Sequence, residues 1–174
     1  MPISWNEIRQ NAIRFSREWA EETREDAEAK SFWDEFFQVF GVRRRLIATF
    51  EERVKNIKGQ YGFIDVFWRG LVLAEHKSRG KSLDQAESQA FDYYEDLARE
   101  GRTSELPRYV ILSDFERFVL YDLDPDEQLN LPLFSGRQVR KVEFSLKDFH
   151  KKIQEFAFVA GYKQHRLRDE DPIN

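Results

Sequence analysis

The sequence predicts a mixed α/β domain, with a sheet covered by helices on both faces and two further helices at the N-terminus. The predicted elements follow one another as helices, strands, a helix, strands and a final helix. The predicted strands are apolar on both faces, which is typical of central strands covered on two sides. The length of 174 residues and the 41% content of hydrophobic residues suffice for one sizeable core.

The composition excludes several classes of site and protein. There are no cysteines, so disulfides, thiolate zinc sites and cysteine nucleophiles are excluded, and we expect a reducing, cytoplasmic location. No apolar run is long enough to cross a membrane, and the N-terminus does not resemble a signal peptide. The net charge of −4 argues against a protein that simply coats nucleic acid, but an enzyme that cuts DNA needs only local basic charge.

Two amphipathic helices are predicted before residue 41. Ser4 and Glu7 form a capping box that begins the first helix, which we expect to extend to about Glu21. Thr23 can begin the second helix, which ends at Gly41. Both helices place large apolar side chains at helical spacing, and we expect these in the core: Ile8, Ile13, Phe15, Trp19, Phe32, Trp33, Phe36, Phe37 and Phe40.

The centre of the chain predicts most of the sheet. Residues 49–54 favour an edge strand, although the mixed pattern from residue 46 also permits a short helix. Arg69 and Gly70 lie in a predicted turn between two strands. Apolar strands are predicted at residues 63–68, 71–77, 108–113 and 118–122.

Two more helices complete the predicted domain. One apolar stripe predicts a helix from Leu83 to Arg99, closed by Gly101, and another predicts a final helix over residues 146–161. Loops are indicated at Asp124-Pro125-Asp126 and Pro132, and a polar tail ends at Asn174. We expect one domain over residues 1–174, made of N-terminal helices (1–41), a core with the candidate site (42–123) and a C-terminal strand and helix (124–174).

Asp65, Glu75 and Lys77 form the pattern D-x9-E-x-K, which is typical of metal-dependent nucleases. In such a site two carboxylates hold Mg²⁺, the metal polarises a phosphate oxygen, and the lysine positions or deprotonates the attacking water. Residues i and i+2 of a strand share a face, so Glu75 and Lys77 are expected to point together. The alternative is a structural ion-pair cluster at the end of the sheet.

The spelling of this motif is weak evidence by itself, because 32 acidic residues and 10 lysines produce an acid-x-Lys triplet about twice by chance. The triplet occurs twice, as Glu75-His76-Lys77 and as Glu28-Ala29-Lys30. The second lies in a predicted helix, where residues i and i+2 do not share a face. The first ends an apolar strand, where a charge is costly without a function, and we therefore prefer it.

The nuclease hypothesis predicts the length of the turn between the two strands. A two-residue turn at Arg69-Gly70 would place Asp65 opposite Ala74 and send Glu75 to the other face. A three-residue loop, Arg69-Gly70-Leu71, with a left-handed residue at or near Gly70, would place Asp65 and Glu75 on one face, as would a β-bulge. The hypothesis therefore requires an odd loop or a bulge.

Further candidate residues surround this centre. Gln89 and Tyr93, four positions apart on one helix, could orient the lysine, the water or a phosphate, or could be a helix-edge amide and a core tyrosine. His76 is expected to point away from the acids as a core or surface histidine, while its backbone carbonyl could bind metal. Glu25 or Glu28 could supply another metal carboxylate, although most acidic helix residues face solvent. Candidate DNA-phosphate contacts, with a solvated surface position as the alternative, are Ser78, Arg79, Lys81 and the run Arg43, Arg44 and Arg45.

These residues resemble the PD-(D/E)xK nuclease superfamily, with Ile64-Asp65 at its Pro-Asp position and Gln89-Ala90-Phe91-Asp92-Tyr93 similar to its Q-x-x-x-Y helix motif. The chain is similar in particular to the N-terminal nuclease region of MmeI-like single-chain restriction–modification enzymes, types IIG and IIL. The similar segments are Ser31–Phe37, Phe40–Val42, Gly62–Trp68, Glu75–Lys81, Leu106–Val110 and Ser113–Phe115.

The resemblance implies a restriction-endonuclease-like core in which Asp65 and Glu75 bind Mg²⁺ or Mn²⁺, Lys77 is catalytic, and Glu25 or Glu28 completes the site. It implies hydrolysis of double-stranded DNA, with two copies pairing to cut both strands. It also implies that a methyltransferase, which would use S-adenosylmethionine, and a target-recognition region follow in the same full-length chain. No methyltransferase motif is present, so we expect this chain to be an excised nuclease domain.

Two other functions are compatible with the same residues. A catalytically silent DNA- or partner-binding domain would keep the nuclease fold without the reaction. A structural interaction domain would scatter Asp65, Glu75 and Lys77 over different faces. If the Asp65 and Glu75 carboxylates lie together, the structural interaction domain is excluded, and the nuclease and the silent binding domain remain.

Overall fold

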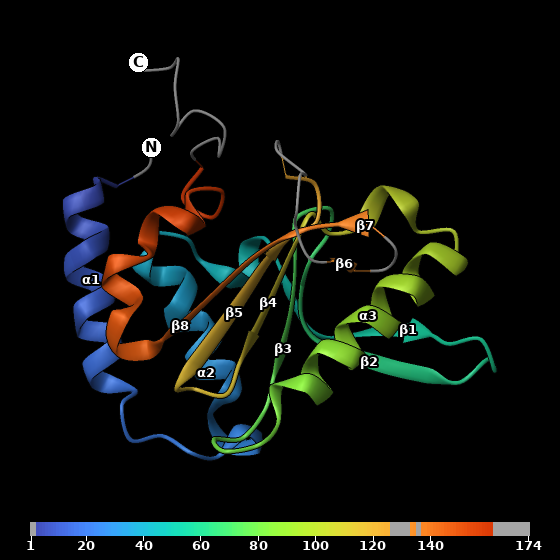
Figure 1. The fold of residues 1–174 in the computed structure, drawn as a ribbon, viewed down its shortest axis with the longest axis horizontal. Helices are drawn as coiled ribbons and strands as arrows, with labels where there is room; N and C mark the ends of the chain where they lie inside the picture. The colour runs from blue at the N-terminus through green and yellow to red at the C-terminus, as the bar shows by residue number, and fades with distance from the viewer. Residues whose placement is uncertain (1–2, 126–132, 135–136, 162–174) are drawn as a thin grey trace.

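A six-stranded mixed sheet forms the centre of the structure, with helices on both of its faces (Figure 1). The computed structural model describes residues 3–125, 133–134 and 137–161. Helices α1 (Trp5–Glu18) and α2 (Glu25–Val39) cover one face, and α3 (Leu83–Arg99) covers the other. The predicted fold class, with its two N-terminal helices, is confirmed. The predicted loop residues Asp126 and Pro132 and the tail from residue 162 lie outside the described residues.

The three α-helices begin and end close to the predicted residues. The Ser4 hydroxyl accepts a hydrogen bond from the Glu7 backbone N–H at 3.1 Å, which satisfies a donor that the first turn leaves free. α2 ends at Val39, and Gly41 follows with a left-handed φ of 77°. α3 has the predicted bounds. Among the described residues, no helix combines the length and apolar character that a membrane span requires.

The sheet has the strand order β1-β2-β3-β4-β5-β8, in which β3 and β4 are parallel and the other neighbours antiparallel. A parallel pair needs a crossover connection, and α3 supplies it. The predicted edge strand is confirmed, because β1 lies at one edge. The strands are β1 (Thr49–Lys55), β2 (Tyr61–Trp68), β3 (Val72–His76), β4 (Tyr109–Ser113), β5 (Arg117–Asp122) and β8 (Arg140–Ser145), with a separate ribbon of β6 (Leu133–Phe134) and β7 (Arg137–Gln138).

A three-residue turn, Arg69-Gly70-Leu71, joins β2 to β3. Trp68 pairs with Val72 across it, and the Leu71 N–H donates to the Trp68 carbonyl at 2.9 Å. Gly70 has φ 78°, the left-handed conformation expected for this loop. The loop with an odd number of residues that the nuclease hypothesis requires is therefore present. If the pairing of β2 and β3 is extended by one residue beyond Val66 and Ala74, Asp65 stands opposite Glu75.

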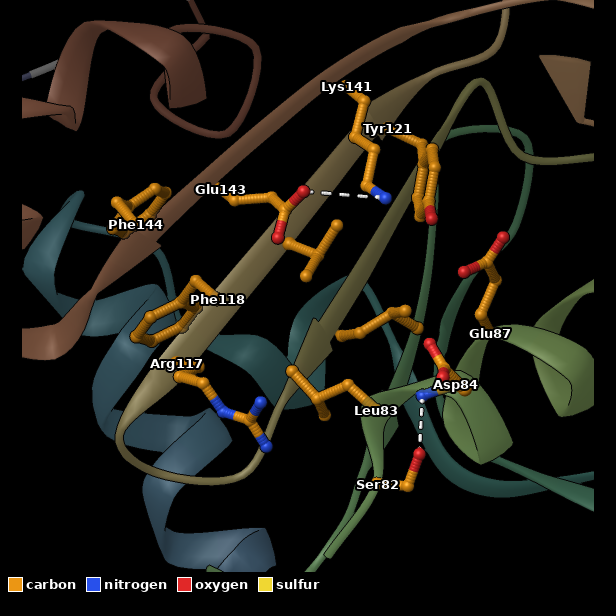
Figure 2. Close-up of a pocket in the computed structure, with 12 residues that line it drawn as sticks. Ser82, Leu83, Asp84, Glu87, Arg117, Phe118, Tyr121, Lys141, Glu143 and Phe144 are labelled. Carbon is orange, nitrogen blue, oxygen red and sulfur yellow. Dashed lines mark hydrogen bonds and ion pairs between the residues drawn. The ribbon is translucent and has the colours of Figure 1, made fainter. Parts of the chain in front are cut away.

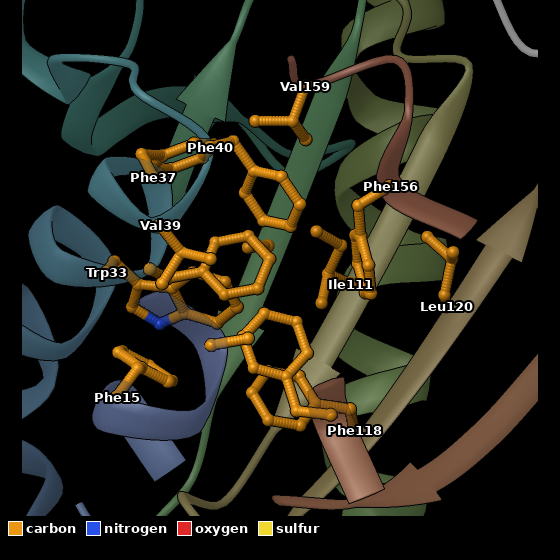
Figure 3. Close-up of a cluster of buried hydrophobic side chains, with 14 of the residues drawn as sticks. Phe15, Trp33, Phe37, Val39, Phe40, Ile111, Phe118, Leu120, Phe156 and Val159 are labelled. Atoms are coloured by element: carbon orange, nitrogen blue, oxygen red, sulfur yellow. The ribbon is translucent and has the colours of Figure 1, made fainter. Parts of the chain in front are cut away.

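Two hydrophobic clusters fill the two faces of the sheet. The larger lies between the sheet and the two N-terminal helices, and many of its members are aromatic (Figure 3). Phe32 and Phe115, for example, meet edge to face with ring centroids 5.2 Å apart, a favourable separation for aromatic pairs. The smaller cluster lies beneath α3. Of the predicted core residues of α1, Ile13 is only half-buried, and Ala12 is buried beside it on the core-facing side.

The C-terminal segment corrects one prediction. In place of one helix over residues 146–161, the structure has two 3₁₀ helices, η3 (Leu146–Lys151) and η4 (Ile153–Phe156), which lie near α1 (Figure 1). A spacing of three between apolar residues fits both helix types, because both bring those positions to one side. Lys152, with φ −117°, separates the two pieces, and each buries its own aromatic ring. The other short helices are η1 (Arg44–Leu46) and η2 (Thr103–Glu105).

Replacing Gly70 tests whether this turn controls the hairpin. Gly70→Ala forces a side chain into the left-handed region, which costs roughly 1–2 kcal/mol. The added Cβ would lie 3.6 Å from the Ser104 carbonyl, an ordinary contact, so the strain comes from the backbone alone. We expect urea denaturation to show a loss of stability of that size. Gly70→Asn should lose less, because asparagine tolerates this conformation better, and equal stability of all three proteins would contradict the assigned turn.

Candidate functional site

Asp65 and Glu75 come together where β2 and β3 diverge. The backbone pairing of these strands stops at Val66 and Ala74, one residue before the two acids. Beyond that point the carboxylates become the hydrogen-bond partners. The Asp65 N–H donates to Glu75 Oε2 at 3.0 Å, and the His76 N–H donates to Asp65 Oδ2 at 2.8 Å. The diverging strand ends therefore hold the two acidic side chains against each other.

Burial raises the pKa of both carboxyl groups in this acidic pair. Desolvation is the largest cause for each, and Glu75 is only 2% exposed. The neighbouring charge of Asp65 raises the pKa of Glu75 further, and the two groups share a side-chain hydrogen bond. Two adjacent carboxyl groups of this kind favour holding one proton between them. The pair therefore concentrates negative potential at one point of the sheet.

Lys77 lies directly after β3 and completes the motif. Its backbone N–H donates to the Ser113 carbonyl at 2.9 Å, which ties this segment to the end of β4. Its side chain is half-buried, and its positive charge lowers the pKa of both Asp65 and Glu75. The structure therefore brings the three motif residues within electrostatic reach of one another.

A third carboxylate, that of Glu51, lies near Asp65, and sequence reasoning missed it. Glu51 of β1 stands on the rung opposite Asp65, where regular pairing of β1 and β2 is interrupted, and it has a left-handed φ of 53°. Its charge raises the pKa of Asp65. Lys30 of α2 forms an ion pair with Glu51 at 3.0 Å, and both line a cavity of about 200 Å³ with Asp65. A positive φ at a residue other than glycine has no sequence signal, so the pattern could not reveal Glu51.

The acidic residues predicted on α2 are less closely placed. Glu28 is half-buried and does not line the cavity that contains Asp65. The side chain of Glu25 is not among those that the structure describes. Within the described residues, no group of three or more acidic or histidine side chains has the arrangement of a metal site. The structure therefore brings two predicted metal ligands together, and a contribution from Glu25 or Glu28 stays a prediction.

Tyr93 of α3 lies close to the acidic pair, and Gln89 precedes it by one helical turn. Burial and the charge of Glu75 raise the pKa of Tyr93 to about 12, and its hydroxyl accepts a hydrogen bond from the Phe63 N–H. The ring also covers Gly62, where a Cβ would come within 2.8 Å of it, so the close approach requires glycine there. One turn away, Gln89 Oε1 is buried and has no hydrogen-bond partner among the described residues. Tyr93 is therefore held in place by its contacts, whereas the Oε1 atom of Gln89 can still accept a hydrogen bond.

His76 is a core histidine, one of the two placements that the sequence predicts. Its Nδ1 accepts a hydrogen bond from the Trp33 indole N–H at 3.1 Å, and the Phe115 ring packs 4.3 Å away between centroids. This network assigns the ring proton to Nε2, which has no hydrogen-bond partner in the described part of the chain. Burial lowers the pKa of His76 to about 3, so the ring is neutral near pH 7. Metal binding by its backbone carbonyl stays a prediction.

Two of the predicted DNA-contacting arginines are engaged within the protein. Arg79 donates to the Glu22 carbonyl at 2.8 Å and forms an ion pair with Glu116 at 3.0 Å. Arg44 forms an ion pair with Asp34 at 2.7 Å. A phosphate would have to compete with these partners. The other predicted contacts are Lys81, Arg43 and Arg45, which are exposed, and Ser78, which is half-buried.

A separate cavity of about 410 Å³ lies between the start of α3 and the β5–β8 edge of the sheet (Figure 2). Three of its charged side chains form ion pairs within the protein: Lys141 pairs with Glu143 at 3.4 Å, and Arg117 pairs with Asp114 at 2.8 Å. None of the predicted site residues lines it. The acidic pair at the diverging strands is therefore the better candidate for a functional site.

Comparisons with known proteins agree with this fold. A family model described as "MmeI, N-terminal domain" matches residues 10–174. Among solved structures, a chain of the "cryoEM structure DrdV-DNA complex" matches with a TM-score of 0.50 and 14% sequence identity over 91% of this chain. The match spans 14% of the length of that chain, and at this identity it shows a likeness of fold alone. No curated protein matches the sequence.

Glu75→Gln tests the electrostatic cost of the acidic pair. The amide keeps an oxygen for the Asp65 N–H and removes the cost of ionising a buried carboxyl group beside Asp65, so we expect higher stability at pH 7. A gain of about 1 kcal/mol would raise Tm by about 2–4 °C in calorimetry. Because the folded pKa of Glu75 is raised, the gain should vanish below the ordinary pKa of 4.5, where both states are protonated. The exposed control Glu143→Gln should leave Tm unchanged, and a Tm below that of the control would contradict the proposed cost.

His76→Gln tests whether His76 is buried as an uncharged ring in the folded protein. Since the folded pKa of about 3 lies below the ordinary 6.5, the unfolded state gains a proton first as the pH falls. Wild-type stability should therefore decrease by up to about 1.4 kcal/mol for each pH unit between these values through this residue. Urea denaturation at pH 7 and pH 5 should show a larger decrease for the wild type than for His76→Gln. The same decrease in both proteins would mean that His76 is not buried as a neutral ring.

Proposed function

Since the chain belongs to the family of MmeI N-terminal domains, we propose that it is a Mg²⁺-dependent endonuclease domain that hydrolyses DNA phosphodiester bonds. The observation that carries this proposal is the convergence of Asp65 and Glu75, with Lys77 beside them, at the diverging strands. Burying two carboxylates against each other is costly, because each loses its hydration and repels the other. A function in binding a cation accounts for that cost.

The two carboxylates fit a hard divalent cation. Mg²⁺ prefers oxygen ligands and is commonly held by one or two carboxylates, with waters and substrate phosphates completing its shell. Asp65 and Glu75 would hold it, and their raised pKa values indicate a negative potential that a cation relieves. Mn²⁺ has similar ligand preferences. When bound, the cation would polarise a phosphate oxygen and lower the pKa of the attacking water.

The neighbouring side chains would position the reacting groups. Lys77 would stabilise the negative charge that develops on the phosphate, or hold the attacking water by a hydrogen bond. Tyr93, neutral at physiological pH, would donate its hydroxyl proton in a hydrogen bond to a phosphate or a water. The buried Oε1 of Gln89, one turn before Tyr93, would accept a hydrogen bond from a water.

We also propose that the domain works within a longer restriction–modification enzyme of type IIG or IIL. The chain spans 14% of the DrdV chain, whose structure is that of a complex with DNA, and this supports DNA as the substrate. A methyltransferase, which would use S-adenosylmethionine, and a target-recognition region would follow in the same polypeptide. One site cuts one strand, so cleavage of double-stranded DNA would require two copies to pair.

Plasmid nicking at increasing Mg²⁺ concentration tests the proposed reaction. We expect metal-dependent nicking that EDTA abolishes. Asp65→Asn removes a metal ligand and Lys77→Ala removes the positioning cation, so each should lower the rate by at least about 100-fold.

Two variants control for the chemical change alone. Asp124→Asn and Lys147→Ala alter exposed residues outside the site, and both should nick at the wild-type rate. If Asp65→Asn nicks as fast as these controls, the assigned site is wrong. If the wild type does not nick with Mg²⁺ or Mn²⁺, the chain is a catalytically silent DNA- or partner-binding domain instead.

A further inference from the structure

One face of the β1–β2 hairpin carries basic and aromatic side chains in register. Lys55 pairs with Tyr61 and Arg53 with Phe63, and directly opposite residues of an antiparallel pair share a face. The guanidinium of Arg53 lies 4.4 Å from the Tyr61 ring centroid, and the Lys55 ammonium lies 5.7 Å from it. These are cation–π distances, so the four side chains form one surface, which we call the hairpin platform.

The aromatic rings of the hairpin platform face solvent. Tyr61 is 50% exposed and Phe63 is 52% exposed. The opposite face of the same hairpin is covered by α3, since Val54 belongs to the core beneath that helix and the Tyr93 ring lies over Gly62. The hairpin is thus anchored from one side, and it reaches the right-hand edge of the molecule in Figure 1. Large exposed rings on an anchored element mark a contact surface.

The charge of this hairpin differs from that of the chain. Residues 53–63 contain Arg53, Lys55 and Lys58 and no acidic residue, although the whole chain has a net charge of −4. Local basic charge attracts a polyanion, and interleaved aromatic rings add a flat surface on which bases can stack. A protein partner with an apolar surface would gain nothing from the two platform cations, Arg53 and Lys55. Charge and ring placement therefore favour a nucleic acid.

The hairpin platform leads directly to the candidate site. After Arg53–Phe63 the ladder continues with Glu52–Ile64, and Glu51 and Asp65 stand at the rung after that. Phe63 therefore stands two residues before a proposed metal ligand on the same strand. A strand of DNA with one phosphate at the acidic pair would therefore have the platform within reach of its neighbouring nucleotides.

We propose that the hairpin platform binds the DNA strand next to the phosphate that is cut. Arg53 and Lys55 would contact backbone phosphates, and Tyr61 and Phe63 would stack on bases or sugars. The binding would be independent of sequence, because phosphates and ring faces are common to all nucleotides. This inference rests on the proposed function, since it assumes that the chain acts on DNA.

Equilibrium binding tests the platform without cleavage. The anisotropy of a fluorescein-labelled DNA duplex in EDTA would be measured against the whole chain at several NaCl concentrations. The double variant Tyr61→Ser with Phe63→Ser should weaken binding about tenfold, because stacking contacts are lost. The double variant Arg53→Gln with Lys55→Gln should also weaken it and reduce the slope of log K against log salt by about 2.

Matched controls separate these effects from general changes in charge and polarity. Leu46→Ser removes an exposed apolar side chain elsewhere, and Lys147→Gln with Lys151→Gln removes two cations from the C-terminal segment. Both controls should bind DNA like the wild type, and thermal melts should show that all variants fold. If the platform variants bind like the controls, or if the wild type does not bind DNA, the proposal is wrong. A change confined to oligomeric state in light scattering would also overturn it and indicate a contact between copies.

The variant Asp65→Asn separates this inference from the proposed function. If it binds DNA normally, the platform variants bind more weakly than their controls, and neither it nor the wild type nicks, the nuclease function fails while the platform stands. If the wild type nicks and the platform variants nick and bind equally well, the function stands and the platform fails.

Discussion

The register of the β2–β3 hairpin is the constraint on which the candidate site depends. A shift of one residue would move every side chain of a strand to the other face. The turn Arg69-Gly70-Leu71 prevents that shift, because Gly70 adopts a left-handed conformation and the loop has an odd length. Asp65 therefore stands opposite Glu75, and the two acids meet where backbone pairing ends. The helices on either side protect this arrangement but do not create it.

The two faces of β3 differ in charge, because one carries an acidic side chain and the other a neutral histidine. Glu75 joins the acidic pair, where desolvation raises its pKa and where a second carboxylate is adjacent. His76, the next residue, turns into the aromatic core, accepts a hydrogen bond from Trp33 and stays neutral because burial lowers its pKa. Ionisable charge on β3 is thus confined to the face of Glu75, and the face of His76 is uncharged. Such a separation suits a cation-binding site that must be rigid, because the apolar core holds the backbone while the acids remain available.

Much of the fold could be predicted because its signals are local. The capping residues Ser4 and Glu7 and the glycines that follow α2 and α3 act within one turn of the chain, so the helix ends were close to the predicted ones. The C-terminal segment was predicted less well. Its apolar spacing fits an α-helix and a 3₁₀ helix equally, and packing against α1 and β8 selects two short 3₁₀ pieces.

By itself the sequence determined the motif residues Asp65, Glu75 and Lys77 and the strands, apolar on both faces, that carry them, because residue type and apolar runs are properties of the chain alone. Only the tertiary structure decided the rest of the site. It selected the three-residue turn, brought Glu51 beside Asp65 through a left-handed backbone, and bound Arg79 to the carbonyl of Glu22. These outcomes depend on partners far away in the sequence, whose distances arise only when the sheet and helices pack together.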